Sequence, residues 1–185
     1  MEKELIADAK HRMDKAVEAV KTEFNTVRSG RASVGLLDRV HVDYYGTSTP
    51  LKQMANIAAP EPRLVTIQPF DKTSMRNIEK AIMESDLGLN PSNDGNVIRL
   101  PIPSLTEDRR KELVRMVHKL AEDGRIAVRN VRRDCMKDLK ELVHDGEVGE
   151  DAEKRAEHEV QKSTDDHVHE IDELLKHKEA EILEV

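Results

Sequence analysis

The sequence predicts an α+β protein in which a long three-helix bundle is interrupted, after its first helix, by a small β-rich domain with a single helix. All seven prolines fall between Pro50 and Pro103. Residues 1–29 contain neither proline nor glycine, and residues 104–185 contain no proline and only three glycines. Because proline breaks helix interiors and glycine weakens them, both ends of the chain are expected to be helical and the middle mixed.

The first helix is predicted from about Glu2 to Arg28. Apolar residues recur along it every seven positions: Ile6, Met13, Val20 and Val27. This spacing places them on one stripe of a helix. The Ser29-Gly30 pair that follows is a stop signal for the helix.

The middle of the chain changes to strand-like patterns. Three segments are predicted strands: Val40–Tyr45, Leu64–Ile67 and Val97–Ile102. Three segments rich in Gly, Pro, Asn, Ser or Thr are predicted turns or loops: Gly46–Pro50, Ala59–Pro62 and Leu87–Gly95. One helix is predicted from about Ser74 to Ser85, with Ile78, Ala81 and Ile82 on one face.

The helical pattern returns at Ser104. Either Ser104 caps the second long helix in a capping box with Glu107, or Thr106 caps it with acids in the first turn. The predicted apolar stripe is Leu113, Val117, Leu120, Val128, Val131, Cys135 and Leu142. A third helix is predicted from about Asp151 to the end of the chain. Its inward-facing residues are Ala156, Val160, Val168, Ile171, Leu174, Leu175 and Ile182.

These three amphipathic helices each have a polar face, so none is stable alone and together they predict a bundle. We assign residues 1–30 plus 105–185 to the bundle and residues 31–104 to the inserted domain. A helix of 35–40 residues is about 55 Å long, so the bundle should be elongated. Two chain crossings join the domains, and few contacts are expected there. The predicted hinge residues are Gly30, Arg31, Ser104 and Leu105.

Composition excludes several classes of protein. The chain has 185 residues and a net charge of −7, so no global basic field draws it to nucleic acid. Its single cysteine, Cys135, lies on the apolar stripe, excludes an internal disulfide and suits the reducing cytoplasm. No apolar run approaches the roughly 20 residues of a membrane span. No nucleophile motif, phosphate-binding glycine loop or metal-ligand cluster is present, so we expect neither an enzyme nor a cofactor or metal.

The charge is unevenly distributed along the chain. Residues 106–140 carry seven acids and eleven bases, a net +4, whereas residues 141–185 carry sixteen acids and five bases, a net −11. Four arginines of the second helix follow i, i+4, i+7, i+8 spacing and are expected to point outward: Arg125, Arg129, Arg132 and Arg133. Guanidinium groups bind phosphate bidentately. Because no aromatic residue follows Phe70, such a face suits folded RNA recognised through backbone and shape.

Other interpretations of these arginines stay open. A basic helix face is often only solvated, or paired with a neighbouring acidic helix, and the third helix is rich in acids. Arg28 and Arg31 flank the first chain crossing and are also RNA-binding candidates. They are equally explained as cations favoured at the C-terminal end of a helix.

Several strings of residues resemble those of the bacterial ribosome recycling factor family. The strings are Arg12-Met-Asp-Lys15, Ser29-Gly-Arg-Ala-Ser33, Tyr44-Tyr-Gly46, Ser85-Asp-Leu-Gly-Leu-Asn-Pro91, Leu105-Thr-Glu-Asp-Arg-Arg110 and Val128-Arg-Asn-Val-Arg-Arg-Asp134. The resemblance covers essentially the whole chain and is least distinctive after about Leu142. It implies an L-shaped protein of transfer-RNA-like dimensions, with an antiparallel three-helix bundle as the long arm and a β/α/β domain on a two-stranded hinge.

The resemblance also implies a function. Members of the family act with elongation factor G and GTP to split the post-termination ribosome into subunits, and they are not themselves enzymes. Their bundle lies on the large subunit, where arginines contact ribosomal RNA. By position these correspond to Arg129 and Arg132 here. The implied partners are therefore large-subunit ribosomal RNA and GTP-bound elongation factor G, with the chain acting as a monomer and without a membrane.

Two other classes of function remain as alternatives. A coiled-coil adaptor would bind partner helices but would not need an inserted β-rich domain. A translation inhibitor that blocks the ribosomal A site would share the RNA-binding face. An assay of subunit splitting with elongation factor G and GTP separates that alternative from recycling.

Overall fold

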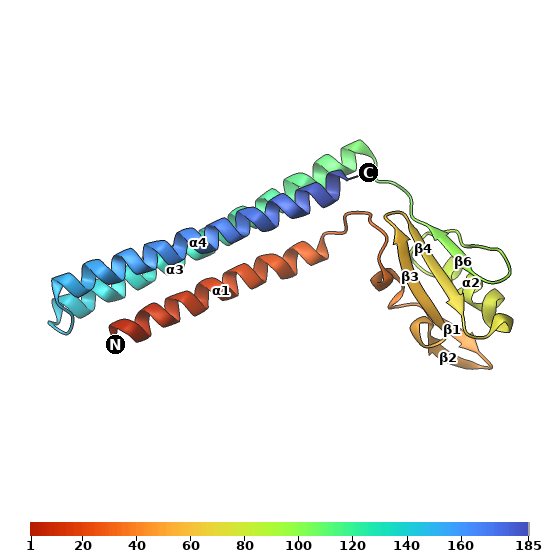
Figure 1. The fold of residues 1–185 in the computed structure, drawn as a ribbon, viewed down its shortest axis with the longest axis horizontal. Coiled ribbons are helices and arrows are strands. Elements are labelled where there is room, and N and C mark those ends of the chain that lie inside the picture. The colour runs from red at the N-terminus through yellow and green to blue at the C-terminus, as the bar shows by residue number, and fades with distance from the viewer. Residues whose placement is uncertain (185) are drawn as a thin grey trace. The chain divides into compact units, whose positions relative to one another are not determined.

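The computed structural model describes residues 1–184, and they form two compact units. One unit, the bundle, contains residues 1–29 together with the residues from Glu107 onward. The other, the insert, contains Gly30–Thr106. Figure 1 shows long helices in the bundle and short strands with one helix in the insert, which confirms the predicted α+β class.

Three long helices make the bundle: α1 (Glu2–Thr26), α3 (Glu107–His144) and α4 (Glu150–Leu183). α1 ends two residues before the predicted Arg28, because Val27 is already extended. α3 begins at Glu107, which places Thr106 rather than Ser104 at the capping position. The predicted end of the third helix falls in part on Val185, which lies outside the described residues.

Contacts between the helices fix their directions. Lys10 of α1 pairs with Glu159 at 2.6 Å. Lys21, further along α1, pairs at 3.1 Å with Glu170, further along α4, so these two helices run parallel. Arg12 pairs at 2.7 Å with Asp134 in the second half of α3. Because Val20, later in α1, packs against Gly124, earlier in α3, these helices are antiparallel and the bundle alternates in direction.

Most of the predicted stripe residues are buried, but the seam of α3 differs in detail from the prediction. Leu120 and Leu142 are only half-buried, and Leu139 takes the buried position near the end of the helix. Val168 and Leu174 of α4 are also half-buried. The corrections have one cause, since the 3.6-residue helical period moves the buried seam gradually round a long helix.

At Gly124, α3 packs closely against both α1 and α4. A Cβ atom built there would lie 2.3 Å from Val20 Cγ2 and 3.3 Å from Ile171 Cδ1. The glycine lies inside α3, where it would ordinarily weaken the helix. Its absent side chain therefore serves close packing, a role that the sequence analysis did not recognise.

The insert contains a hairpin and a four-stranded antiparallel sheet around one helix. The hairpin joins β1 (His41–Tyr44) to β2 (Thr47–Pro50). The sheet has the order β3-β4-β6-β5. Its strands are β3 (Ala55–Glu61), β4 (Leu64–Pro69), β5 (Ser92–Asn93) and β6 (Ile98–Pro101). The helix α2 (Met75–Glu84) and three short 3-10 turns, Val34–Leu37, Leu51–Gln53 and Lys72–Ser74, complete the insert.

The predicted loop Leu87–Gly95 contains the short strand β5. Two predicted turns are correct only in part: Gly46 and Pro62 lie in turns, whereas Thr47–Pro50 forms β2 and Ala59–Glu61 belongs to β3. Proline misled the prediction there. β3 is an edge strand, and its pairing with β4 shifts register between Ala58 and Glu61, around Pro60. Edge strands and bulges tolerate a residue that lacks a backbone donor. β6 alternates between buried and exposed residues, as expected for a sheet with one covered face.

Both chain crossings are anchored in the insert at the turn between β3 and β4. The Ala32 amide donates to the Pro62 carbonyl at 2.7 Å, and the Ile102 amide donates to the Arg63 carbonyl at 2.8 Å. Gly30 has a φ of +74°, and a Cβ there would lie 2.7 Å from Leu105 Cγ. The two chain crossings are therefore in contact with each other where they enter the insert.

Two further expectations concern Cys135 and membrane-spanning helices. Cys135 is buried, and desolvation raises the pKa of its thiol, as befits a small core residue. Among residues 1–184, no helix has an apolar stretch long enough to cross a bilayer.

Gly124→Ala should destabilise the protein, although alanine favours helix formation by about 1 kcal/mol over glycine. Val20 is β-branched and stiff, so overpacking is expected to lower the free energy of unfolding by about 1–3 kcal/mol. Thermal and urea unfolding measure the loss. Gly35→Ala is the control, since its Cβ would meet nothing closer than 3.7 Å. An unchanged or raised Tm for Gly124→Ala would contradict this packing role.

Candidate nucleic-acid interface

Arg125 does not point outward as the sequence analysis expected. Its side chain is 18% exposed and lies against α4, where Nε donates to Asp172 at 2.8 Å. A second bond of 2.8 Å runs from its guanidinium to Glu122 on its own helix. Burial opposes the charged form, but these two carboxylates more than compensate, and the pKa of Arg125 is raised. Its side chain is therefore engaged in holding α3 to α4.

Arg132 lies seven residues further along the same seam, and it is half-buried. One guanidinium nitrogen donates to Gln161 Oε1 of α4 at 3.0 Å, and the Gln161 amide donates in turn to Asp165 at 2.9 Å. A guanidinium carries five donor hydrogens, so this one bond leaves most of the fork available. The contact orients Arg132 at the rim of the α3–α4 seam.

Arg129 and Arg133 face away from the bundle core. Both are exposed. Arg129 makes one long contact, 3.4 Å, with Glu122, and its side chain is half exposed. The Arg133 side chain forms no ion pair or hydrogen bond with another of residues 1–184. Exposed pairs of this kind contribute little to stability, so both side chains are available to a ligand.

Further cations continue this face along α3, and we call the set the outer row. Its members are Arg115, Lys119, Arg129, Arg133, Lys137 and Lys140, all exposed. At about 100° per residue they fall within an arc of about 80°. With a rise of about 1.5 Å per residue, the row extends for about 37 Å. Glu122 is the one acid on that arc between the two ends of the row.

Four of the six cations in the outer row have no partner within the described chain: Arg115, Lys119, Arg133 and Lys140. The acids of α4 bind elsewhere, since Glu159 and Glu170 pair with lysines of α1 and Asp172 pairs with Arg125. The alternative that the acidic helix neutralises the basic one thus holds for Arg125 and not for the outer row. Sequence analysis missed four of these cations, although the i+4 and i+7 steps from Arg133 signal two of them, Lys137 and Lys140.

Arg28 lies far from Arg132 along the bundle axis, whereas Arg31 belongs to the insert. Arg28 is exposed just after α1, and the neighbouring Ser29 donates to Glu181 of α4 at 2.6 Å. Since Arg132 bonds to Gln161 of the same helix, the two levels are about 30 Å apart. The six predicted RNA-binding arginines therefore do not form a single cluster.

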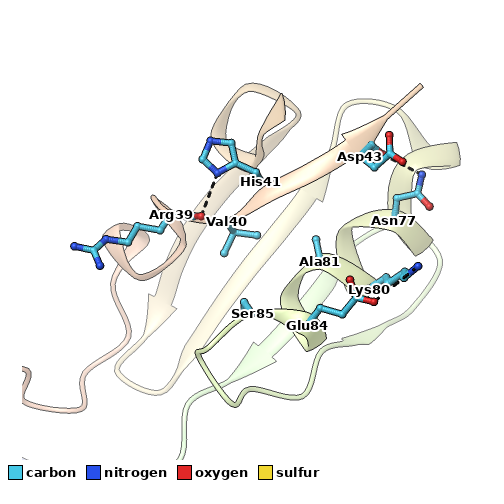
Figure 2. Close-up of a pocket in the computed structure, with 9 residues that line it drawn as sticks. All are labelled: Arg39, Val40, His41, Asp43, Asn77, Lys80, Ala81, Glu84 and Ser85. Carbon is cyan, nitrogen blue, oxygen red and sulfur yellow. Dashed lines mark hydrogen bonds and ion pairs between the residues drawn. The ribbon is translucent and has the colours of Figure 1, made fainter. Parts of the chain in front are cut away.

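A groove of about 530 Å³ lies in the insert between β1 and α2. Figure 2 shows its cations Arg39 and Lys80 at opposite ends, rather than converging on one point. Lys80 is 3.8 Å from Glu84, and the Asn77 amide donates to the Asp43 carbonyl. The groove thus lacks a focused charge for an anion. Within residues 1–184, no three metal-ligating side chains cluster.

Comparison by sequence places the chain among known proteins. A family model described as ribosome recycling factor matches residues 20–183. The ribosome-recycling factor of Rubrobacter xylanophilus is 57% identical over 180 residues, which cover 97% of each chain. That of Geobacillus kaustophilus is 54% identical over 185 residues, which cover 100% of each.

Comparison of folds agrees with the comparison of sequences. A solution structure of ribosome recycling factor matches with a TM-score of 0.70 and 43% identity, covering 100% of this chain and 98% of the other. A second match has a TM-score of 0.62 and 46% identity and covers 99% of each chain. It comes from models of the T. thermophilus ribosome recycling factor and the E. coli elongation factor G bound to the E. coli post-termination complex.

The arginines of α3 should separate into structural and free groups when each is removed. Arg125→Ala is expected to lower the free energy of unfolding by about 1 kcal/mol or more, because it removes two ion pairs and the packing of the stem. Arg133→Ala should change it by no more than about 0.5 kcal/mol. Urea unfolding at constant m-value measures both. Equal effects would mean that the two environments do not differ energetically.

Proposed function

Since the chain belongs to the ribosome recycling factor family, we propose that it acts with elongation factor G and GTP to split the post-termination ribosome into subunits, freeing messenger and transfer RNA. In this proposal the chain is a non-catalytic monomer of the cytoplasm that needs no cofactor. The partner protein hydrolyses the GTP, and the chain transmits the resulting movement.

The observation that carries the proposal is the outer row of α3. Six exposed cations on one helix face, four of them without a partner in the described chain, are suited to phosphate. Arg132 supports the same surface, because Gln161 already holds its guanidinium at the rim of the seam. We propose that the outer row and Arg132 bind large-subunit ribosomal RNA. Arg28 would make a separate contact about 30 Å away along the bundle, and Arg31 would contribute from the insert.

The proposed mechanism is that of a lever. The bundle stays on the large subunit through arginine–phosphate contacts, and the insert moves when elongation factor G pushes it. Two chain segments connect the units. We propose that Gly30, Arg31, Ser104 and Leu105 in these segments form the hinge. Gly30 suits this role, since glycine adopts its positive φ of +74° without strain.

Arg132→Ala should weaken binding to isolated large subunits about ten- to a hundredfold, since a charge-assisted phosphate contact is worth about 1.5–3 kcal/mol. The Tm should fall little, because only one neutral partner is lost. Arg132→Lys should rescue binding in part, since an ammonium cannot replace the planar fork. Arg155→Ala, an exposed arginine of α4, is the matched control. Normal binding and recycling by Arg132→Ala would exclude this residue from the interface.

Binding to the large subunit should depend steeply on salt, because arginine–phosphate contacts release counterions. We expect the affinity to fall at least about tenfold between roughly 50 and 200 mM monovalent salt at fixed magnesium. Removing Lys137 and Lys140 together should reduce the log–log slope by about one to two. Binding that does not change with salt would show that protein contacts dominate.

The decisive assay of the proposed function measures conversion of purified post-termination ribosomes to subunits, with and without elongation factor G and GTP. Splitting that requires both the chain and its partner is the expected result. A chain that occupies the ribosome and blocks translation without splitting it would instead be an inhibitor of the A site.

A further inference from the structure

Three of the four aromatic residues of the chain gather at one end of the insert, and we call them the aromatic tip: Tyr44, Tyr45 and Phe70. The rings of Tyr44 and Tyr45 meet edge to face, with centroids 4.7 Å apart. The Tyr44 hydroxyl donates to Asp71, next to Phe70, at 3.3 Å. Tyr45 is 82% exposed and Phe70 is 72% exposed, the highest values among the large apolar side chains of residues 1–184.

The backbone at the tip is also unfavourable for the residue that occupies it. Tyr45 and Gly46 form the two-residue loop between β1 and β2, with φ of +51° and +83°. A turn with two positive φ values favours Asn-Gly, and Tyr45 is the one non-glycine residue with positive φ in the described chain. Strain of this kind persists where it serves a function. An exposed aromatic ring at such a position is therefore a candidate for binding.

The aromatic tip lies at the end of the insert opposite the chain crossings. Both crossings bond to the turn before β4, through Pro62 and Arg63. Phe70 follows the last residue of β4, and the six steps from Leu64 to Phe70 extend about 20 Å. The whole length of β4 therefore separates the tip from the crossings, so a force applied at the tip acts on the crossings through a long lever arm.

The charge around the tip indicates what kind of partner it fits. Asp43 accepts a bond of 2.8 Å from the Gly46 amide, and Asp71 accepts from Thr73 and Tyr44. Bonds from Thr73 and Tyr44 lower the pKa of Asp71, so it is ionised at neutral pH. Lys72, next to Asp71, donates to Asn96. Carboxylates repel phosphate, so exposed rings among them fit a protein surface rather than RNA bases.

We propose that the aromatic tip is the surface through which a protein partner pushes the insert, and that this partner offers an apolar hollow bordered by lysine or arginine. The inference rests on the proposed recycling function and adds the contact through which the force arrives. Tyr45 and Phe70 would enter the hollow, since aromatic side chains commonly dominate binding energy at interfaces. Asp43 and Asp71 would face the cationic border.

The test compares subunit splitting by the wild-type chain and by Tyr45→Asn combined with Phe70→Ser, using purified post-termination ribosomes, elongation factor G and GTP. We expect the variant to require at least about tenfold more elongation factor G for half-maximal splitting. Its binding to isolated large subunits should be unchanged. The Tm should stay equal or rise, because asparagine suits the turn better than tyrosine.

Met83→Ser is the matched control, since Met83 is 61% exposed and lies near the other end of α2, away from the tip. It should leave splitting unchanged. If the wild-type chain does not split ribosomes, the proposed function fails. If the wild type splits and the tip variant splits equally well, the inference about the tip is wrong while the proposed function stands.

The chemical class of the partner has its own measurement. Tyr45→p-benzoylphenylalanine in the full chain, irradiated in the same purified complex, should crosslink to protein. Crosslinks to ribosomal RNA alone, or none in a complex that still splits, would overturn the inference. The same replacement at Gln68, an exposed polar position of β4, measures the background.

Discussion

The packing of α1 against α3 and α4 is the constraint on which the rest of the molecule depends. The partners of α1 begin at Glu107, after the whole insert, so the bundle closes only when both ends of the insert return to it. Gly124 makes the closure tight, because a side chain there would occupy the space of Val20. Ser29 then bonds to Glu181, which ties the outgoing strand to α4. The two chain segments that lead into the insert therefore both start from the same bundle.

Bundle closure also decides which charges remain available. Once α4 covers one side of α3, Arg125 and Arg132 lie at the seam and find Asp172 and Gln161. α1 covers the opposite side, where Arg12 reaches Asp134. The remaining face of α3 is the outer row, which no helix covers. A chain with a net negative charge therefore presents a basic surface, because the acids of α4 are used elsewhere or face elsewhere.

Local patterns predicted the helices well, because amphipathic spacing depends on neighbours three and four residues away. The direction of Arg125 was not predictable in this way, since it depends on the side of α3 that α4 takes. β2 and β3 were missed because Pro50 and Pro60 are common turn signals, and only the sheet order shows that β3 is an edge. Gly124 would weaken an isolated helix, and only its contact with Val20 explains why a glycine occupies this position. Tertiary neighbours, rather than propensity, decided each of these positions.

The interruption of the bundle by the insert has a consequence during synthesis. α3 and α4 are joined by a short connection and can pair as soon as both have emerged, whereas α1 waits through about 80 residues for the first residue of α3. At about 5–20 residues per second, its apolar stripe stays without a partner for roughly 4–16 s, and longer until α4 follows. Such a non-local contact slows folding relative to a helical hairpin. The many charges of α1 keep that waiting helix solvated, so the composition of its outer face serves the nascent chain as well as the finished one.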